Sequence, residues 1–267
     1  MTQKETKYFM TNLIKIDDIN LPELEIYHKF RENAFEGDNS FVADSPKVVN
    51  ELLNTSLEIK SILATKEYYE EFEDLIAQKE ISNLYVAEKK VIESIVGHTL
   101  HHNCMMHGIR PALTPLSEMD DTIIMLDAIT SNENIGSIAR SAAALGVNSY
   151  LISKHSPHPY SRRALRVSMG HASKLKINSY ENIFDTILEL KNLGYTVVAA
   201  EVIPESISLA KFEVPKKWVL LMGIEGKGLS EEIISACDLC VLIEMAEGIR
   251  SLNVGVAASI LMYKFLH

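Results

Sequence analysis

Five near-continuous apolar runs in the second half of the chain place the strongest limit on its fold. They read TIIMLDAI, SYLIS, YTVVAAEV, WVLLMGI and LCVLIEM, all between residues 122 and 245. Such runs are typical of parallel strands that are covered on both faces. Helices are expected between them at 134–145, 161–169, 180–193 and 230–236, and a nearly all-apolar packed helix from Val254. The pattern predicts the α/β class, as a doubly wound domain with a mostly parallel sheet over residues 120–267.

The first part of the chain alternates shorter apolar runs with helical patterns. Residues 57–65 and 83–88 favour strands, whereas 66–78 and 89–97 favour helices. Ser45 is a candidate N-cap, with Pro46 at the first helical position, and Gly97 is a candidate helix end. We therefore expect an N-terminal extension over 1–19, a small αβ domain over 20–97 and a His- and Pro-rich linker over 98–119.

The composition is that of a globular protein, with 47% hydrophobic and 23% charged residues. The apolar runs are shorter than the roughly 18 residues that a membrane span needs, so no membrane partner is expected. The first residues lack the pattern of a signal peptide. Three cysteines provide no disulfide framework, which favours a cytoplasmic location.

Charge is distributed unevenly along the chain. The net charge is −10, and residues 1–93 hold 11 Lys and Arg against 19 Asp and Glu, whereas residues 134–180 hold seven basic residues and no acidic one. Because salt screens charges beyond about 10 Å, a local basic segment binds phosphates even on an acidic molecule. The alternative is a helix surface that is basic without a ligand. The candidate RNA-binding residues are Arg162, Arg163, Arg166 and Lys174.

Three turns that follow predicted strands carry candidate ligand-binding residues, because ligands of such sheets bind beyond the carboxyl ends of the strands. In the first turn, Asn134 and Gly136 lie where a strand gives way to a helix, and Arg140 follows on that helix. A helix N-terminus offers free N–H groups to an anion, and a buried guanidinium needs an anionic partner. An exposed arginine at the helix edge is the alternative interpretation.

The other two turns have different chemistry. LLMGIEGKGLS holds three glycines and Glu225, and glycine lets a backbone approach a ligand closely. It is not a P-loop, because Lys227 precedes the final glycine instead of following it. In the third turn, Ser251 is a candidate cap of the terminal helix, and Asn253 is expected to point inward and find hydrogen-bond partners.

Two groups of His and Cys residues are assigned no chemistry. HTLHHNCMMH lacks a second ligand cluster with zinc spacing, so no metal site is predicted. Cys237 and Cys240 form a single C-x-x-C without a thioredoxin-like context, and a core role is expected for them.

Together the three turns resemble the motifs of the SpoU/TrmH-type RNA ribose 2′-O-methyltransferases of the SPOUT class. NENIGSIARSAAALGV is similar to the first motif of that family, LLMGIEGKGLS to the second and IEMAEGIRSLNVGVAASILMY to the third, in the same order and at the same spacing. Residues 20–97 resemble the small ribosomal-protein-like RNA-binding domain that many members carry ahead of the catalytic domain.

The resemblance implies a C-terminal trefoil knot that binds S-adenosylmethionine, and a homodimer with the active site near the subunit interface. It implies methylation of a ribose 2′-hydroxyl in structured RNA, with ribosomal RNA favoured over transfer RNA by the added N-terminal domain. The alternative is an RNA-binding or ribosome-assembly protein with a degenerate methyltransferase site. The family's cofactor-binding positions fall on Gly223, Ile243, Met245 and Leu252, and its catalytic positions on Asn134, Arg140, Glu225, Ser251 and Asn253.

The sequence departs from the family pattern at four positions. Ile224 stands where the second motif usually has Asn, and Glu244 replaces a proline, which is expected to put a carboxylate beside the adenosine pocket. Gly255 stands where Ser is common, and Glu247 where Gly is common. These departures motivate the alternative of a degenerate site.

Overall fold

The computed structural model describes residues 12–29, 38–224 and 226–267. The chain divides by its internal contacts into two compact units. Unit 1 comprises Met1–Pro111 and Tyr160–Ser173, and unit 2 comprises Ala112–Pro159 and Lys174–His267. This division differs from the domains expected from the sequence, because residues 160–173 belong to the first unit instead of the second.

Unit 2 contains a seven-stranded sheet with the order β10-β12-β9-β11-β6-β7-β8, in which all the pairings are parallel. The five apolar runs are confirmed as strands. β8 and β10 were not predicted, because β8 reads KINSY, with polar residues among the apolar ones, and β10 has two residues. The strands are β6 (Thr122–Leu126), β7 (Ser149–Ser153), β8 (Lys176–Tyr180), β9 (Thr196–Ala200), β10 (Ile207–Ser208), β11 (Trp218–Met222) and β12 (Leu239–Leu242).

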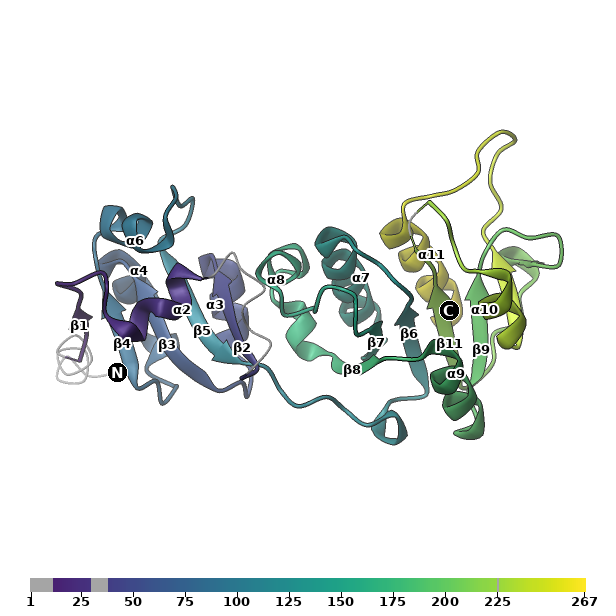
Figure 1. Cartoon of the computed structure of the whole chain (residues 1–267), viewed down its shortest axis with the longest axis horizontal. Coiled ribbons are helices and arrows are strands. Elements are labelled where there is room, and N and C mark those ends of the chain that lie inside the picture. The colour runs from purple at the N-terminus through teal and green to yellow at the C-terminus, as the bar shows by residue number, and fades with distance from the viewer. Residues whose placement is uncertain (1–11, 30–37, 225) are drawn as a thin grey trace. The chain divides into compact units, whose positions relative to one another are not determined.

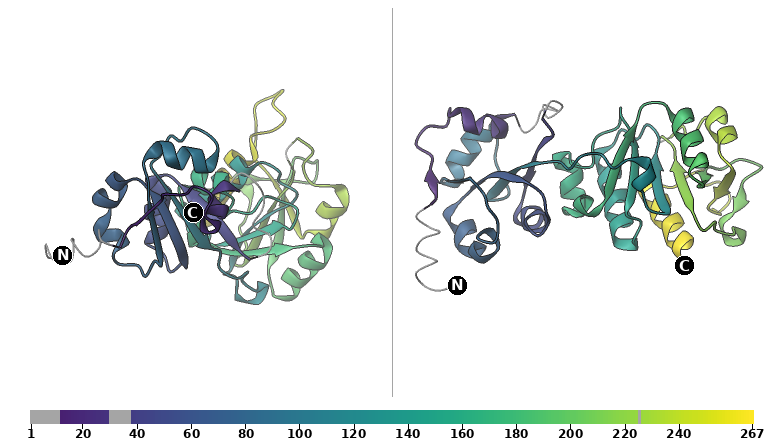
Figure 2. Two further views of the ribbon diagram at one scale, coloured as in Figure 1. Left: turned by 60° about the vertical axis from the view of Figure 1, so that its left-hand side comes forward. Right: turned by 90° about the horizontal axis from the view of Figure 1, so that it is seen from below.

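Helices cover both faces of this sheet, as Figure 1 shows and Figure 2 repeats from below. Two of them, α7 and α11, pack against each other, and α9 packs against α10. Short 3-10 turns lie at Leu116–Glu118 and Leu209–Lys211. The helices are α7 (Asn132–Leu145), α9 (Ile183–Asn192), α10 (Glu231–Ala236) and α11 (Val254–Leu266).

Alternate residues of the strands face the two helix layers, which is the expected arrangement for a sheet buried on both sides. In β11, Val219 and Leu221 belong to a core cluster that includes Ile187 of α9. Trp218 of the same strand faces the other way and contacts Phe265 of α11, with ring centroids 5.1 Å apart. The core of unit 2 is therefore built on both faces of β11, whose carboxyl end leads into the second of the three turns.

Unit 1 contains a five-stranded mixed sheet with the order β1-β4-β3-β5-β2. β5 lies between β3 and β2 and is antiparallel to both. This corrects the expected linker over 98–119, because its central part is a buried strand; the Met, His and Gly residues of CMMHGI lack an alternating pattern. β1 lies in the expected extension and pairs with β4. The strands are β1 (Ile14–Lys15), β2 (Ser40–Asp44), β3 (Ile59–Ala64), β4 (Asn83–Val86) and β5 (Cys104–Ile109).

The helices of unit 1 largely follow the sequence pattern. Gly97 ends α6 in the left-handed conformation at φ 73°, as predicted. Ser45 directly precedes α3, but it has φ 82° and its side chain makes no capping hydrogen bond. The expected helix over 66–78 is interrupted at Phe72. The helices are η1 (Pro22–Leu24), α2 (Glu25–His28), α3 (Pro46–Leu53), α4 (Lys66–Glu71), α5 (Glu73–Ile76), α6 (Lys89–Val96) and α8 (Arg162–Ser168). The 3-10 helix η3 (His171–Lys174) follows α8, and its last residue is the first of the second part of unit 2.

Helix α8 packs on β2. Its N-cap Ser161 accepts a hydrogen bond from the Ala164 amide, and the preceding Tyr160 ring lies edge-on to Phe41 of β2 at 5.1 Å between centroids. Asp44, at the end of β2, forms an ion pair with Arg162. These contacts are the physical reason that this segment belongs to unit 1, and no local sequence pattern predicts them.

The terminal helix α11 is packed on one side only. Leu261, Met262 and Phe265 are buried, but Val256 is 51% and Tyr263 58% exposed. Within the single chain, one face of the predicted packed helix is therefore uncovered, and an almost all-apolar helix carries no polar stripe that would mark an outer side.

Candidate functional site

A pocket of about 550 Å³ lies in unit 2 at the carboxyl ends of β9, β11 and β12. Its lining comes from the segments that follow these strands and from the beginnings of α7 and α11. Predicted site residues in the lining are Asn134, Gly223, Ile243, Met245, Ser251, Leu252 and Asn253. The structure thus brings together three turns that are spread over about 120 residues of the chain.

The turn after β11 is folded so tightly that no side chain fits at Gly223. A Cβ atom at Gly223 would lie 2.5 Å from the carbonyl carbon of Gly228 and 2.6 Å from the amide nitrogen of Leu229. The Gly228 amide donates a hydrogen bond to the Ile224 carbonyl oxygen at 2.8 Å. That bond uses the Ile224 backbone, which any residue at this position would supply.

Glu201 was not predicted as a site residue, although it lines the pocket. It directly follows β9, and its carboxylate accepts hydrogen bonds from the amides of Leu229 at 2.9 Å and Val202 at 3.0 Å. A Cβ atom at Gly228 would lie 1.9 Å from Glu201 Oε2, so the carboxylate and the glycine turn fit directly together. The available signal was an acidic residue directly after a buried strand.

Asn253, and not Ser251, caps the terminal helix. Its Oδ1 accepts hydrogen bonds from the amides of Gly255 at 2.9 Å and Val256 at 3.3 Å, while its Nδ2 donates to Asn134 Oδ1 at 3.1 Å. The hydrogen-bond partners expected for Asn253 are therefore present, but the residue is exposed instead of pointing inward, and the cap expected at Ser251 is displaced by two residues. One side chain connects the first turns of α7 and α11.

The two helices approach closely because small residues face each other. Ser259 Oγ lies 2.8 Å from Ser141 Oγ, and a Cβ atom at Gly255 would lie 3.0 Å from Ser137 Oγ. Gly255, which departs from the family pattern, is buried at this contact. A Cβ atom here would require the Ser137 side chain to move by a small amount.

Arg140 does not lie in the pocket lining. Arg140 lies on α7 and is exposed, so the structure matches the alternative of an arginine at the helix edge within this single chain. Glu225 lies outside the described residues. Their expected catalytic roles remain predictions.

The sequence predicts the Glu244 carboxylate beside the adenosine pocket, but the structure places it elsewhere. It accepts hydrogen bonds from the Ser208 hydroxyl and from the Ala210 amide at 3.2 Å. These bonds lower the pKa of Glu244, the Ser208 hydroxyl most of all. Its neighbours Ile243 and Met245 line the pocket but Glu244 does not, so this carboxylate holds the 208–210 segment instead of facing a ligand.

The lining combines backbone polar groups with aliphatic side chains. Leu242, Ile243, Met245 and Leu261 supply apolar surface, and the glycine turn supplies amides and carbonyls. This combination suits a ligand with an apolar ring and polar edges, since a few placed polar groups orient such ligands in largely apolar pockets.

The predicted RNA-binding arginines have different environments in unit 1. Arg162 donates to the buried Asp44 carboxylate from Nη2 at 2.7 Å and from Nε at 3.1 Å. Arg166 Nε lies 3.7 Å from the other oxygen of that carboxylate. Arg163 is exposed on α8, and Lys174 is exposed at the start of the second segment of unit 2.

The His- and Cys-containing segments serve packing and hydrogen bonding. His107 of β5 pairs with Ser40 at 2.8 Å between Nε2 and Oγ, and burial lowers the pKa of its imidazole. Cys237 and Cys240 pack against the core of unit 2, and burial raises the pKa of the Cys237 thiol to about 12. Within residues 12–29, 38–224 and 226–267, no three His, Cys, Asp or Glu side chains gather as metal ligands. None of the helices in this described part is long and apolar enough to cross a membrane.

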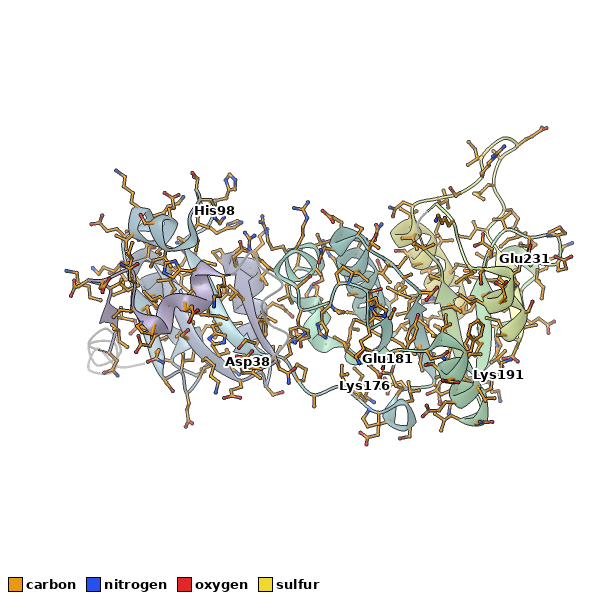
Figure 3. All side chains as sticks on the ribbon, viewed as in Figure 1. Asp38, His98, Lys176, Glu181, Lys191 and Glu231 are labelled. Carbon is orange, nitrogen blue, oxygen red and sulfur yellow. The ribbon has the colours of Figure 1, made fainter. Side chains whose placement is uncertain are left out.

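Ion pairs also connect the sheet of unit 2 to its neighbouring segments. Lys176, labelled in Figure 3, donates to the Glu118 carbonyl at 3.1 Å and pairs with Asp120 at 2.5 Å. Lys191 pairs with Asp238 at 2.9 Å, and Asp238 also accepts from the Val197 amide at 2.8 Å. These pairs lie outside the pocket lining and serve the sheet and its connections.

Comparison with known proteins identifies the family. The model of the SpoU rRNA methylase family matches residues 121–263, more than half of the chain. An uncharacterized tRNA/rRNA methyltransferase of Mycobacterium bovis is 28% identical over 232 residues, covering 84% of this chain and 79% of that protein. A putative TrmH family tRNA/rRNA methyltransferase of Staphylococcus aureus is 31% identical over 143 residues, covering 54% of this chain and 57% of that protein.

Solved structures share the fold along nearly the whole chain. An AdoMet-bound rRNA methyltransferase from Sinorhizobium meliloti superimposes with a TM-score of 0.82 at 23% identity, covering 95% of this chain and 97% of the other. The SpoU methyltransferase AviRb from Streptomyces viridochromogenes, in complex with AdoMet, gives 0.76 at 19% identity, covering 92% and 97%. With the family model matched across all three pocket-forming turns, the chain belongs to the SpoU/TrmH family of RNA methyltransferases.

Proposed function

We propose that this protein transfers a methyl group from S-adenosylmethionine to a ribose 2′-hydroxyl of structured RNA in the cytoplasm, with ribosomal RNA as the favoured substrate. The observation that carries the proposal is the single pocket formed by the three family motifs, closed by the Asn253–Asn134 hydrogen bond. Two structures of the same fold are described as bound to AdoMet, and their proteins as an rRNA methyltransferase and a SpoU methyltransferase.

The pocket fits S-adenosylmethionine in size and lining. Its volume of about 550 Å³ lies in the range of small-molecule sites. Ile243, Met245 and Leu252 offer apolar contacts to an adenine ring, and the backbone at Gly223 offers polar groups at close approach. When bound, this cofactor supplies an electrophilic methyl group on a sulfonium.

The protein's own residues then have to position the ribose. Asn134 and Asn253 fix the beginnings of α7 and α11 at the pocket, and Ser251 lies beside them in the lining. A guanidinium stays protonated at neutral pH, so Arg140 is assigned to orienting the 2′-hydroxyl and a neighbouring phosphate, not to removing the proton. Glu225 is assigned to holding that arrangement.

We propose that a second copy of the chain covers the exposed face of α11. Val256, Ile260 and Tyr263 are 51%, 39% and 58% exposed and recur at helical spacing beside the pocket, where Leu252 is also 39% exposed. A contiguous apolar patch of this kind marks an interaction site. In a homodimer built on this face, Arg140 on the neighbouring helix α7 would lie at the subunit interface. The trefoil knot of the family is proposed for the segments after β11 and β12, which meet in the pocket.

The degenerate-site alternative rests on Ile224 and Glu244. The Glu244 ground loses its support, because that carboxylate binds Ser208 and Ala210 and does not line the pocket. The Ile224 ground stays, because a backbone hydrogen bond does not replace a side-chain amide, and the cofactor titration below tests it.

Calorimetric titration with S-adenosylmethionine tests the cofactor, and incubation with ribosomal RNA followed by nucleoside analysis tests the product. We expect micromolar binding and a 2′-O-methylated nucleoside, with Arg140→Lys strongly impaired in turnover but normal in cofactor binding. A base-methylated product would contradict the ribose assignment, and near-normal turnover by Arg140→Lys would contradict the orienting role.

A further inference from the structure

Glu201 is held at the carboxyl end of β9 through its backbone. Its amide donates to the Val241 carbonyl of β12 at 3.1 Å, and its carbonyl accepts from the Ser206 hydroxyl at 2.8 Å. The Ser206 hydroxyl also accepts from the Ile203 amide at 3.2 Å, which closes residues 201–206 into a short loop. The Glu201 side chain therefore begins at a backbone position that the sheet and this loop fix.

The carboxylate of Glu201 lies against the glycine turn that follows β11. Its Oε2 accepts from the Leu229 amide at 2.9 Å, and its Oε1 accepts from the Val202 amide at 3.0 Å. A Cβ atom at Gly223 would lie 2.6 Å from the same Leu229 nitrogen. Gly223 and the carboxylate thus lie against one peptide group, at the place where a ligand can approach the backbone closely.

The two amides do not use the full hydrogen-bonding capacity of this carboxylate. An ionised carboxylate accepts about four hydrogen bonds and donates none, whereas each oxygen of Glu201 is bound to one amide. Glu201 lines the pocket, and it is the one carboxylate among the lining residues that the structure describes. A ligand that fits the pocket should therefore present hydrogen-bond donors to Glu201.

S-adenosylmethionine has three groups that can donate: the adenine amino group, the two ribose hydroxyls and the ammonium of its methionine part. The adenine amino group is flanked by ring nitrogens that only accept, and a carboxylate beside them would be repelled. The ammonium is attached to the carbon that also carries the cofactor's own carboxylate, which Glu201 would repel as well. The neighbouring ribose hydroxyls present two donors without a fixed negative charge, and acidic side chains bind ribose hydroxyls in this way in doubly wound dinucleotide-binding sheets.

We infer that Glu201 binds the 2′- and 3′-hydroxyls of the cofactor's ribose and makes the pocket selective for a ribonucleoside ligand. The inference rests on the proposed function, because it takes the adenosine of S-adenosylmethionine as the occupant of the pocket. The same carboxylate also binds the Leu229 amide, so its removal affects both the turn and the sugar contact. The test has to separate these two effects.

Calorimetric titration of the full chain with S-adenosylmethionine and with its 2′-deoxy and 3′-deoxy forms separates them. The ratio of the affinities for the ribo and deoxy forms reports the sugar contact within each variant, whereas a loosened turn lowers all three affinities alike. Glu201→Ala removes the carboxylate, and Glu201→Gln keeps one oxygen without the charge. The control is Glu205→Ala, which removes an exposed carboxylate of the same loop that does not line the pocket.

We expect the wild type to prefer the ribo form roughly tenfold, because hydrogen bonds to a charged group are strong and each factor of ten corresponds to one such bond. Glu201→Ala should lose this preference and bind S-adenosylmethionine at least about tenfold more weakly. Glu201→Gln should lie between the two, and Glu205→Ala should match the wild type.

Three results would contradict these expectations in different ways. An unchanged ribo preference in Glu201→Ala, with weaker binding of all three ligands, would overturn the inference and restrict Glu201 to holding the turn or the methionine part. Wild-type binding of S-adenosylmethionine without a ribo preference would overturn the inference and leave the proposed function standing. Failure of the wild type to bind any of the three ligands would overturn the proposed cofactor, and the inference with it.

Discussion

The pocket of unit 2 and the charged contact between Asp44 and α8 in unit 1 are built by opposite means. The pocket depends on backbone: a glycine turn, an asparagine cap and small residues between two helices. The α8 contact depends on two ionised arginines, Arg162 and Arg166, held by the buried Asp44 carboxylate. Backbone geometry is insensitive to salt and pH but intolerant of added atoms, whereas a charged surface tolerates changes in side-chain size and responds to salt. The two sites should therefore respond to different perturbations.

The largest expected effect is a loss of cofactor affinity when a methyl group is added at Gly223 in the pocket. Gly223→Ala would place a methyl group 2.5 Å from the Gly228 backbone, so the turn after β11 has to open. Overpacking of this kind costs roughly 1–3 kcal/mol, and we expect cofactor affinity to fall by at least about tenfold. Calorimetry with S-adenosylmethionine measures this fall, and RNA binding should stay unchanged.

A matched control lies three residues away. Gly226 has φ 78°, but a Cβ atom there would meet nothing within 4 Å. Gly226→Ala should therefore show only the strain of its backbone, about 1 kcal/mol. Equal loss of cofactor binding in both variants would mean that strain, and not close approach, controls the turn.

The second largest expected effect is a loss of stability in unit 1. Asp44→Ala leaves Arg162 without its buried partner, and breaking a buried ion pair costs about 3 kcal/mol or more; Arg162 remains 24% exposed, so we expect about 2 kcal/mol. Chemical denaturation should show the loss in unit 1, with S-adenosylmethionine binding retained. An Asp44→Ala protein that lost cofactor binding in parallel with stability would break the comparison between the two units.

The sequence predicts unit 2 far better than unit 1, for a physical reason. Strands buried on both faces leave long apolar runs, so β6, β7, β9, β11 and β12 are visible without a structure. β5 has no such signal, because its Met, His and Gly residues do not alternate. The attachment of α8 to unit 1 depends on contacts between residues more than 100 positions apart, such as Arg162 with Asp44 and Tyr160 with Phe41, which no local pattern records.

Contacts between residues that are distant in the sequence also limit the prediction of the pocket. Of the eight described residues proposed for catalysis or cofactor binding, seven line it, because the family motifs encode the turns themselves. Glu201 was missed because its role comes from a hydrogen bond to Leu229, 28 residues later. The cap moved from Ser251 to Asn253 because both residue types cap helices, and only the three-dimensional position of Asn134 favours the asparagine.

A smaller effect separates the two roles of Asn253. Asn253→Ala removes the cap and the bond to Asn134, whereas Asn253→Ser keeps a capping oxygen and loses only that bond. Loss of a cap costs about 1 kcal/mol, so thermal unfolding should fall for Asn253→Ala and hardly for Asn253→Ser. If the link to Asn134 positions the ribose, both variants should lose turnover equally. Normal turnover by Asn253→Ser would restrict Asn253 to capping.

The smallest effect is the pH response of unit 1. Burial lowers the pKa values of His102 and His107 in the folded protein, so the unfolded chain binds more protons once the pH falls below the usual histidine value of about 6.5. The stability of unit 1 is then fully present above that pH and declines as the pH falls through the lowered folded values.

Denaturation of wild type and His107→Gln between pH 5 and 8 measures this decline (about the range in which histidine titrates). We expect a shallower decline in the variant, with the pocket of unit 2 unaffected, since neither imidazole lies in its lining. A cofactor affinity that followed the same pH curve as unit 1 stability would show that the backbone-built pocket depends on the charged unit after all.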